Sequence, residues 1–431
     1  MGSLARRLWR PLLTSKPHAR FIPVARLISY LVPPTAEEAT AMDMIKYAKS
    51  LKSEEPSYSE AMRILQQGLS FLSATDNSSS HMAFGRLQLS LATIHAKMSN
   101  FEAAADCLKE LLNSNSAPLI TKGAALEALT ALCLQLHQDK VAMDYALDFG
   151  RLWEKEGALS VDSEDSRDIK YEALALRRLA EMPNPTESSD KEVVVSTDAE
   201  NVSAAAVLAL AQFHHVQGNF SAAKELYEKA VINSKKEVES SEFSLSAMSM
   251  VPEAVHVGAV AGLGQLLTVT GDFEEAEQHL THALKETEKN KGEKDPQVGV
   301  ILACIGSLYE QRGAAQGSNE MLITEGMYKS ALDLMKTPPL NNVKEQGWRL
   351  AEIVALTRAR LGVALAPAQY RRSEVQKLRD WVEATWKNSR PLPELGYLNR
   401  LLAGESKDEV MKESKGKSSV VDVRLERVFY I

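Results

Sequence analysis

The chain has 431 residues, of which 45% are hydrophobic and 25% are charged, and this composition excludes a wholly disordered protein. Its formal net charge is −7 at pH 7. The first 36 residues contain six basic residues and no acidic one, which leaves 44 basic against 57 acidic residues and a net charge of −13 for the rest. Because nucleic-acid affinity depends on clustered cations, this acidic body disfavours nucleic-acid binding.

Residues 1–36 have the composition of a mitochondrial presequence, since they are rich in arginine, contain hydroxyl groups and lack acidic residues. Their apolar and basic side chains are spaced compatibly with a short amphipathic helix: Leu4, Leu8 and Trp9 among Arg6, Arg7 and Arg10. Plastid transit peptides overlap in composition but usually carry more Ser and Thr, and a disordered basic tail is the other alternative. We therefore expect import into mitochondria, to the matrix or the matrix face of the inner membrane.

Residues 37–182 show a helical pattern with weak repetition. Two faint copies of one pattern begin at Met42 and Gly85, whereas from 119 to 182 the helical spacing continues but the repeat decays. Pro183 and Pro185 then end a helix. Residues 183–202 contain five acidic residues and a single lysine, which predicts an exposed acidic loop between two helical halves.

Residues 203–337 contain three clearer copies of the pattern. Each copy has two apolar stripes with three- and four-residue spacing, which predicts two antiparallel helices. Gly218-Asn-Phe220 and Gly271-Asp-Phe273 separate the stripes, where Gly tolerates a left-handed C-cap and Asn or Asp can cap the next helix. Small residues recur where the two backbones must come close: Ala211, Gly264 and Gly306 in the first helix, and Ala223 and Ala276 in the second.

This pattern resembles the tetratricopeptide repeat, whose period is about 34 residues. The copies that start at Val257 and Gly299 are 42 residues apart, and the charged connector between them contains Gly292 and Pro296. Both features are similar to the longer repeats of kinesin light chains. The resemblance implies an all-α fold, a right-handed solenoid of antiparallel helix pairs, that binds other proteins.

The resemblance also implies a binding groove, because in tetratricopeptide repeats the second, fifth, sixth and ninth residues of the first helix line the concave face. Chaperone-binding members carry Lys, Arg and Asn there, and kinesin light chains carry Asn pairs, but this chain has neither. A groove of small and apolar residues would instead accept an apolar helix, from a partner protein or from the chain's own C-terminal helices. The positions are Ala205, Leu208, Ala209, Gln212, Gly258, Ala261, Gly262, Gln265, Val300, Ala303, Cys304 and Ser307.

After Thr337-Pro-Pro339, residues 338–403 are predicted to form helices that cap the last repeat. Residues 404–431 are predicted to be a flexible tail with a strand near its end. Val421, Val423 and Leu425 alternate there with charged residues, and alternation with a period of two is typical of a strand. We expect this strand to dock on a partner, to pack on its own chain or to fray.

The sequence contains no recognisable catalytic, cofactor-binding or metal-binding motif. Glu275, His279 and His282 share a helix face and could bind a divalent metal in principle, but surface histidines are the more ordinary interpretation. The three cysteines are spaced for neither a metal nor a disulfide, so we expect reduced, buried thiols at Cys107, Cys133 and Cys304. No stretch approaches the roughly 18 apolar residues of a transmembrane helix.

We therefore expect a non-catalytic protein-binding scaffold, or an assembly or adaptor factor, that acts inside mitochondria without a cofactor. The alternative is an organellar RNA-binding helical-repeat protein, which would need polar base-reading residues at fixed offsets and a basic face. An enzyme, the third possibility, would need a convergent polar site that the sequence does not display.

Overall fold

Fifteen α-helices contain most of the residues that the structure describes. The computed structural model describes residues 36–51, 55–73, 80–156, 173, 176–177, 203–239, 252–317, 320–340, 350–386, 391–406, 409–410 and 419–430. The predicted presequence up to residue 35 and the predicted acidic loop at 183–202 lie outside these residues.

The first half of the chain contains α3 (Ala36–Ser50), α4 (Glu55–Ser73), α5 (Ser80–Lys97), α6 (Phe101–Asn113), α7 (Leu119–Gln135) and α8 (Asp139–Glu156). The second half contains α10 (Ala204–Val216), α11 (Phe220–Glu239), α12 (Pro252–Thr270), α13 (Phe273–Lys291), α14 (Pro296–Gln316), α15 (Met321–Leu334), α16 (Ala351–Leu365), α17 (Arg372–Thr385) and α18 (Pro393–Ala403). A short 3₁₀ helix, η2 (Gln369–Arg371), precedes α17, and two strands, β1 (Val420–Asp422) and β2 (Arg427–Phe429), follow α18.

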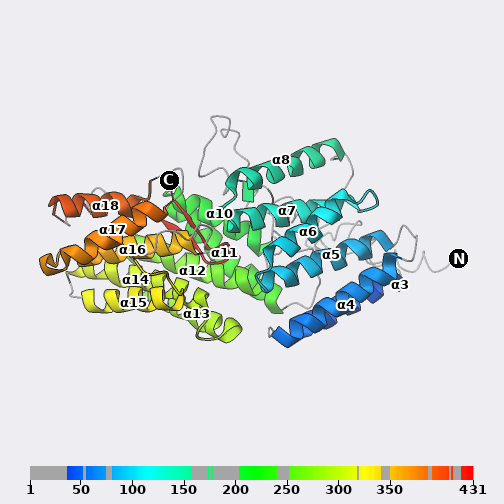
Figure 1. Ribbon diagram of the computed structural model, residues 1–431, viewed down its shortest axis with the longest axis horizontal. Helices are drawn as coiled ribbons and strands as arrows, with labels where there is room; N and C mark the ends of the chain where they lie inside the picture. Colours follow the sequence, from blue (N-terminus) through cyan, green and yellow to red (C-terminus); the bar gives the residue numbers. More distant parts are fainter. Residues whose placement is uncertain are drawn as a thin grey trace, which may run out of the picture.

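The helices pack in sequential pairs, and each pair lies against the next along the chain. Figure 1 shows this stack, which runs from α3 and α4 near the N-terminal end to α17 and α18 at the other end. The prediction of an all-α chain of paired helices is confirmed.

One turn recurs within the pairs. After α5, α7, α10 and α12, the turn places Ser99, His137, Gly218 and Gly271 at positive φ, between 58° and 93°. The N–H of the next residue then donates to the carbonyl five residues earlier, at 2.8 to 2.9 Å, as in a Schellman motif. The same turn therefore recurs between α7 and α8, where the sequence pattern decays, and His137 adopts the positive φ there.

Side-chain caps at these turns differ from one repeat to another. Asn100 caps α6, because its side chain accepts from the N–H of Ala103 at 3.4 Å. Asp272, which was expected to cap α13, makes no such bond, and its carboxylate instead accepts from the Thr270 hydroxyl at 3.0 Å. The backbone bond rather than the side-chain cap is thus the constant part of the turn.

Two kinds of helix alternate in the second half. The first helices of the pairs, α10, α12, α14 and α16, are buried around most of their circumference. Their partners are amphipathic, as in α13, which buries Phe273, Ala276 and Leu280 and exposes Glu274 and Glu275. A helix that is apolar all round requires neighbours on every side, so the first helices line the interior. None of the described helices is long and apolar enough to cross a membrane.

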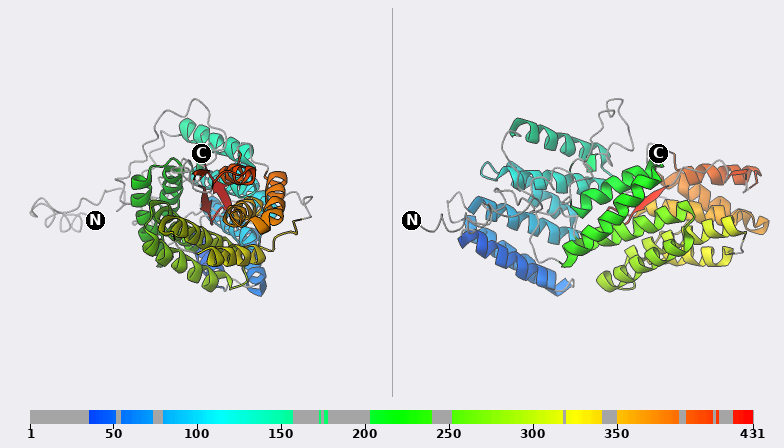
Figure 2. Two further views of the ribbon diagram at one scale, coloured as in Figure 1. Left: turned by 90° about the vertical axis from the view of Figure 1, so that its left-hand side faces the viewer. Right: turned by 180° about the vertical axis from the view of Figure 1, so that it is seen from behind.

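The C-terminal segment fills this interior. Viewed along the long axis, the helices form a ring, and the red C-terminal strands lie inside it (Figure 2, left). β1 packs on α10 and α12, and β2 packs on α16. The segment is almost wholly buried, since no side chain from Ser419 to Tyr430 exceeds 8% exposure.

This segment is a hairpin and not the single strand that the alternation predicts. β1 and β2 pair antiparallel, with Val420 opposite Phe429 and Asp422 opposite Arg427. The chain reverses because the Asp422 carboxylate accepts from the N–H groups of Arg424 and Leu425, at 2.8 and 3.0 Å, and Glu426 adopts a φ of 56°. The predicted tail at 404–431 therefore ends in a core element.

Small residues permit close packing of the helices, as the sequence predicts. A Cβ atom at Gly264 would lie 2.7 Å from Leu280 of α13, and one at Gly306 would lie 2.7 Å from the Tyr328 ring of α15. Gly262 is equally crowded, because a Cβ atom there would overlap the ring of Tyr227 on α11.

We expect Gly262→Ala to lower the free energy of unfolding by about 1–3 kcal/mol, because the added methyl group must displace the buried Tyr227 ring. Gly396→Ala in α18 is the control, since nothing lies within 4 Å of its added methyl group. It should leave stability unchanged or raise it by up to about 1 kcal/mol. Chemical denaturation of both variants measures the difference, and equal behaviour would contradict the packing described.

Candidate protein-binding groove

The predicted groove residues lie on α10, α12 and α14, and all of them are buried. Among the groove residues other than glycine, Gln265 has the largest exposed fraction, 9%. Gly262 faces Tyr227 of the neighbouring α11, so it packs between helices. Gly258 and Gln265 instead face the C-terminal hairpin: a Cβ atom on Gly258 would lie 3.7 Å from the Cβ of Arg424. The hairpin thus occupies at least part of the predicted groove.

Gln265 holds the hairpin by its backbone. Its Nε2 donates to the carbonyl of Val421 at 2.9 Å, and its Oε1 accepts from the N–H of the same residue at 2.9 Å. One amide side chain therefore satisfies both backbone groups of an extended residue, as a neighbouring strand would. Such a contact recognises extended polypeptide without regard to its side chains.

The hairpin carries charged residues into the interior. Asp422, Arg424, Glu426 and Arg427 are each no more than 4% exposed. Arg424 pairs with Asp422 at 3.1 Å, and Glu426 accepts from Nε2 of Gln297 on α14 at 2.9 Å. Each of these groups thus has a polar partner, which buried charges require.

Arg427 makes the most extensive of these contacts. Its guanidinium donates to both oxygens of Glu352 on α16, at 3.2 and 3.3 Å, and to the Leu134 carbonyl at the end of α7, at 2.9 Å. It also donates to Asp139, the first residue of α8. The N–H of Val428 adds a bond to Glu352 at 3.2 Å. Arg427 therefore joins the first helical half to the last.

The first residue of the hairpin segment, Ser419, is also held by a buried polar contact. Glu394 of α18 accepts from the Ser419 hydroxyl at 3.0 Å and from Arg360 of α16 at 3.1 Å. At the other end of the segment, the ring of Tyr430 lies 5.7 Å from that of Trp386, centroid to centroid.

Glu352 is ionised in this setting. Burial alone would raise the pKa of its carboxyl, but the charge of Arg427, the nearby His137 and the N–H of Val428 lower it to about 2, from an ordinary value of 4.5. Nδ1 of His137 lies 3.1 Å from Oε1 of Glu352. The carboxylate at this position therefore depends on the cation that the hairpin supplies.

Sequence reasoning missed the anchoring residues Asp139, Glu352, Glu394 and Arg427. Arg427 and Asp139 are 288 positions apart, so no local spacing relates them. One signal was present in the sequence: charged and apolar side chains alternate from Val421 to Glu426, and the structure buries both sets. A buried charged residue requires an oppositely charged or hydrogen-bonding partner, so such a pattern predicts polar groups on the facing helices.

The candidate metal ligands do not converge. His279 lies 3.9 Å from Glu275, whereas the ring of His282 lies against His256, with centroids 5.9 Å apart. Among the described residues no group of three or more His, Cys, Asp or Glu side chains is placed to hold a metal ion.

The thiols are free, with Cys133 and Cys304 buried and Cys107 half-buried. Burial raises the pKa of Cys133 to about 11 and that of Cys304 to about 12, so both stay protonated and poorly nucleophilic at neutral pH.

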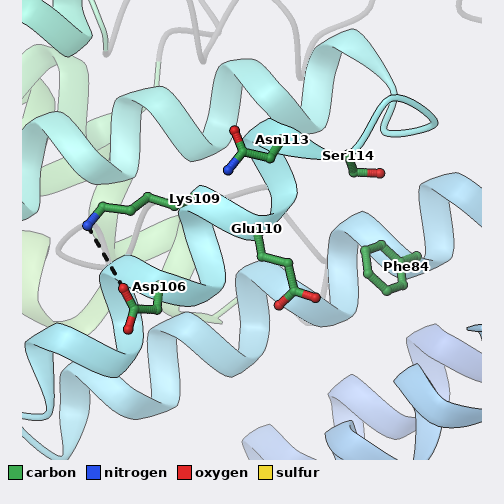
Figure 3. Close-up of a pocket in the computed structure, with 6 residues that line it drawn as sticks. All are labelled: Phe84, Asp106, Lys109, Glu110, Asn113 and Ser114. Atoms are coloured by element: carbon green, nitrogen blue, oxygen red, sulfur yellow. Dashed lines mark ion pairs between the residues drawn. The ribbon is translucent and has the colours of Figure 1, made fainter.

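A hollow of about 580 Å³ lies against α5 and α6 (Figure 3). Its charged groups are engaged with neighbours: Lys109 lies 3.9 Å from Asp106, and Glu110 accepts from Gln88 at 3.0 Å. Phe84, Asn113 and Ser114 complete its lining. The hollow is open and its polar groups do not converge on one point, so it does not resemble a catalytic site.

No family model matches the chain, and no curated protein matches it in sequence. The described residues establish an all-helical protein whose helices pack in pairs, an architecture consistent with a helical repeat.

We expect Gln265→Leu to lower the free energy of unfolding by about 2–4 kcal/mol, because it leaves the buried N–H and carbonyl of Val421 without partners. Gln376→Leu is the control, since Gln376 is exposed and its side chain bonds to the exposed Asp380, and it should change stability by no more than about 0.5 kcal/mol. Equal losses in denaturant titrations would show that the hairpin bond does not contribute to stability.

Glu352→Gln should be less stable than the wild type by about 3 kcal/mol at pH 7. Because the pKa of Glu352 is lowered in the folded protein, its contribution is complete above pH 4.5 and is lost as the pH falls towards 2. The difference between the two proteins should therefore shrink across that range in unfolding experiments. Asp148→Asn, which removes an exposed ion pair with Arg151, should cost less than about 1 kcal/mol. A pH-independent gap for Glu352→Gln would contradict the ionised pair.

Proposed function

We propose that the protein is a non-catalytic scaffold of tetratricopeptide-like repeats that binds another polypeptide inside mitochondria. The observation that supports this most is the contact between Gln265 and both backbone groups of Val421. Gln265 is the ninth residue of the sequence copy that begins at Val257, and the corresponding position lines the peptide groove in tetratricopeptide repeats. The interior surface therefore has the means to hold an extended chain.

The arrangement of the helices supports the same function. Paired helices that contact mainly their neighbours form extended curved surfaces, and binding proteins use such surfaces widely. The recurrent Schellman turn between the helices of a pair agrees with the repeat that the sequence pattern predicts.

The mitochondrial address rests on the composition of residues 1–36, which lie almost wholly outside the described residues. Six basic residues without an acidic one contrast with a body of net negative charge. That negative charge also disfavours the alternative, an organellar RNA-binding protein, because counterion release from phosphates requires clustered cations.

The mitochondrial location is tested by expressing the full chain with an epitope inserted between residues 186 and 200, which leaves both ends of the chain unmodified. The epitope then reports the cell fraction that contains the protein. We expect protection from protease in intact mitochondria. Arg6→Glu, Arg7→Glu and Arg10→Glu together should abolish import, whereas lysine at the same three positions should preserve it. Accumulation of the wild-type protein in the cytosol would refute this part of the proposal.

The binding function is tested by the native mass of the epitope-tagged protein in a mitochondrial extract. We expect a complex larger than the 47.4 kDa of the chain, with a second protein in stoichiometric amount. The complex should survive ribonuclease. Elution of the chain alone would contradict a scaffold, and a complex that ribonuclease dissolves would favour the RNA-binding alternative.

A further inference from the structure

We propose that the interior groove binds an extended segment of a partner protein, and that residues 419–430 of the chain itself occupy this site in the free protein. The partner segment shares the chemistry of the hairpin: aliphatic side chains at alternate positions and an arginine that enters between Asp139 and Glu352. This inference rests on the proposed scaffold function, to which it adds the surface, the class of ligand and an internal competitor.

The buried charged residues of the hairpin favour a role in specific binding over a role in core packing alone. Burying ions is unfavourable unless each is paired, and well-packed apolar residues often stabilise a core as much as a buried ion pair does. This hairpin nevertheless buries Asp422, Arg424, Glu426 and Arg427 within a short segment. Buried charges of this kind favour one register and one set of partner groups. Specific binding of a segment requires this property, whereas the packing of a hydrophobic core does not.

Two parts of the site recognise different features of the bound segment, its backbone and its arginine side chain. Gln265 binds backbone groups only, so any extended segment can take the place of Val421. The cation site is selective, because it combines the carboxylates of Asp139 and Glu352 with the carbonyl of Leu134. An arginine fork can satisfy three acceptors in different directions, which a lysine ammonium matches poorly at such distances.

The solenoid side of the cation site is anionic. Without a guanidinium, two carboxylates would share a mostly buried site, with Asp139 at 22% side-chain exposure and Glu352 at 12%, and His137 would stand 3.1 Å from Glu352. The pair of carboxylates therefore favours a guanidinium from outside the solenoid. Arg427 supplies it in the free protein, and an arginine of a partner segment can supply it equally.

The test uses a fluorescent peptide with the sequence of residues 419–430 as the probe, and full-length protein as the receptor. Three receptors are compared: the wild type, Arg427→Ala, and the control Arg151→Ala, which removes an arginine that is 71% exposed on α8. A second peptide carries alanine in place of the arginine that corresponds to Arg427. Fluorescence anisotropy gives the dissociation constants.

We expect the Arg427→Ala protein to bind the first peptide at least about tenfold more tightly than the other two receptors do. In those receptors the intact hairpin competes at a high effective concentration. The alanine peptide should lose this binding. The proposal is overturned if a folded Arg427→Ala protein binds neither peptide, or binds both equally.

A second measurement applies to the wild type alone, so that it decides the question if Arg427→Ala does not fold. Amide hydrogen exchange compares the hairpin with α12. Faster exchange in the hairpin shows that it leaves the groove while the solenoid stays folded, as the proposal requires. Exchange at the rate of α12 shows a permanent core element and overturns the proposal. A dimer with exchanged hairpins would assign the site to a second copy of the chain and would also overturn it.

These outcomes are separable from those for the scaffold function. If the peptide does not bind to the Arg427→Ala protein but a stoichiometric complex is found in mitochondria, the partner binds another surface. If the peptide binds but no complex is found, the groove recognises extended segments and the mitochondrial scaffold proposal fails.

Discussion

The buried guanidinium of Arg427 links parts of the chain that lie far apart in the sequence. Where each helix pair contacts mainly its neighbours, an added element can supply further long-range contacts. Arg427 supplies them by binding Leu134 and Asp139 near the junction of α7 and α8, and Glu352 at the start of α16. The ring of helices in Figure 2 surrounds β1 and β2, and Arg427, the first residue of β2, ties two distant helix pairs together.

The apolar character of the inner helices follows from the same arrangement. α12 is buried almost continuously from Val255 to Thr268, because α11 and α13 cover one side and the hairpin covers another. An open groove of this composition would expose a large apolar surface to water. The hairpin removes that surface, and its valines join the same hydrophobic core as the helices. Any partner that enters the groove must therefore replace this cover.

Much of the fold could be predicted from the sequence because helix pairing depends on local spacing. Apolar residues three and four apart located the helices, and Gly264 and Gly306 marked where neighbouring side chains come close. The α7–α8 turn escaped notice because His137 adopts the left-handed conformation that glycine usually takes. The reversal at Asp422 was also missed, since side-chain bonds to the backbone break the strand without interrupting the alternation.

The candidate site was harder to predict, because its parts meet only after the stack has curved. The separation of 288 positions between Asp139 and Arg427 also has a consequence for folding. Closing so long a loop costs more conformational entropy than forming a pair of adjacent helices. Helix pairs can therefore form first, while the apolar interior stays open to solvent and to chaperones until the hairpin docks. A variant that lacks residues 419–430 would keep its helix pairs without sealing its interior.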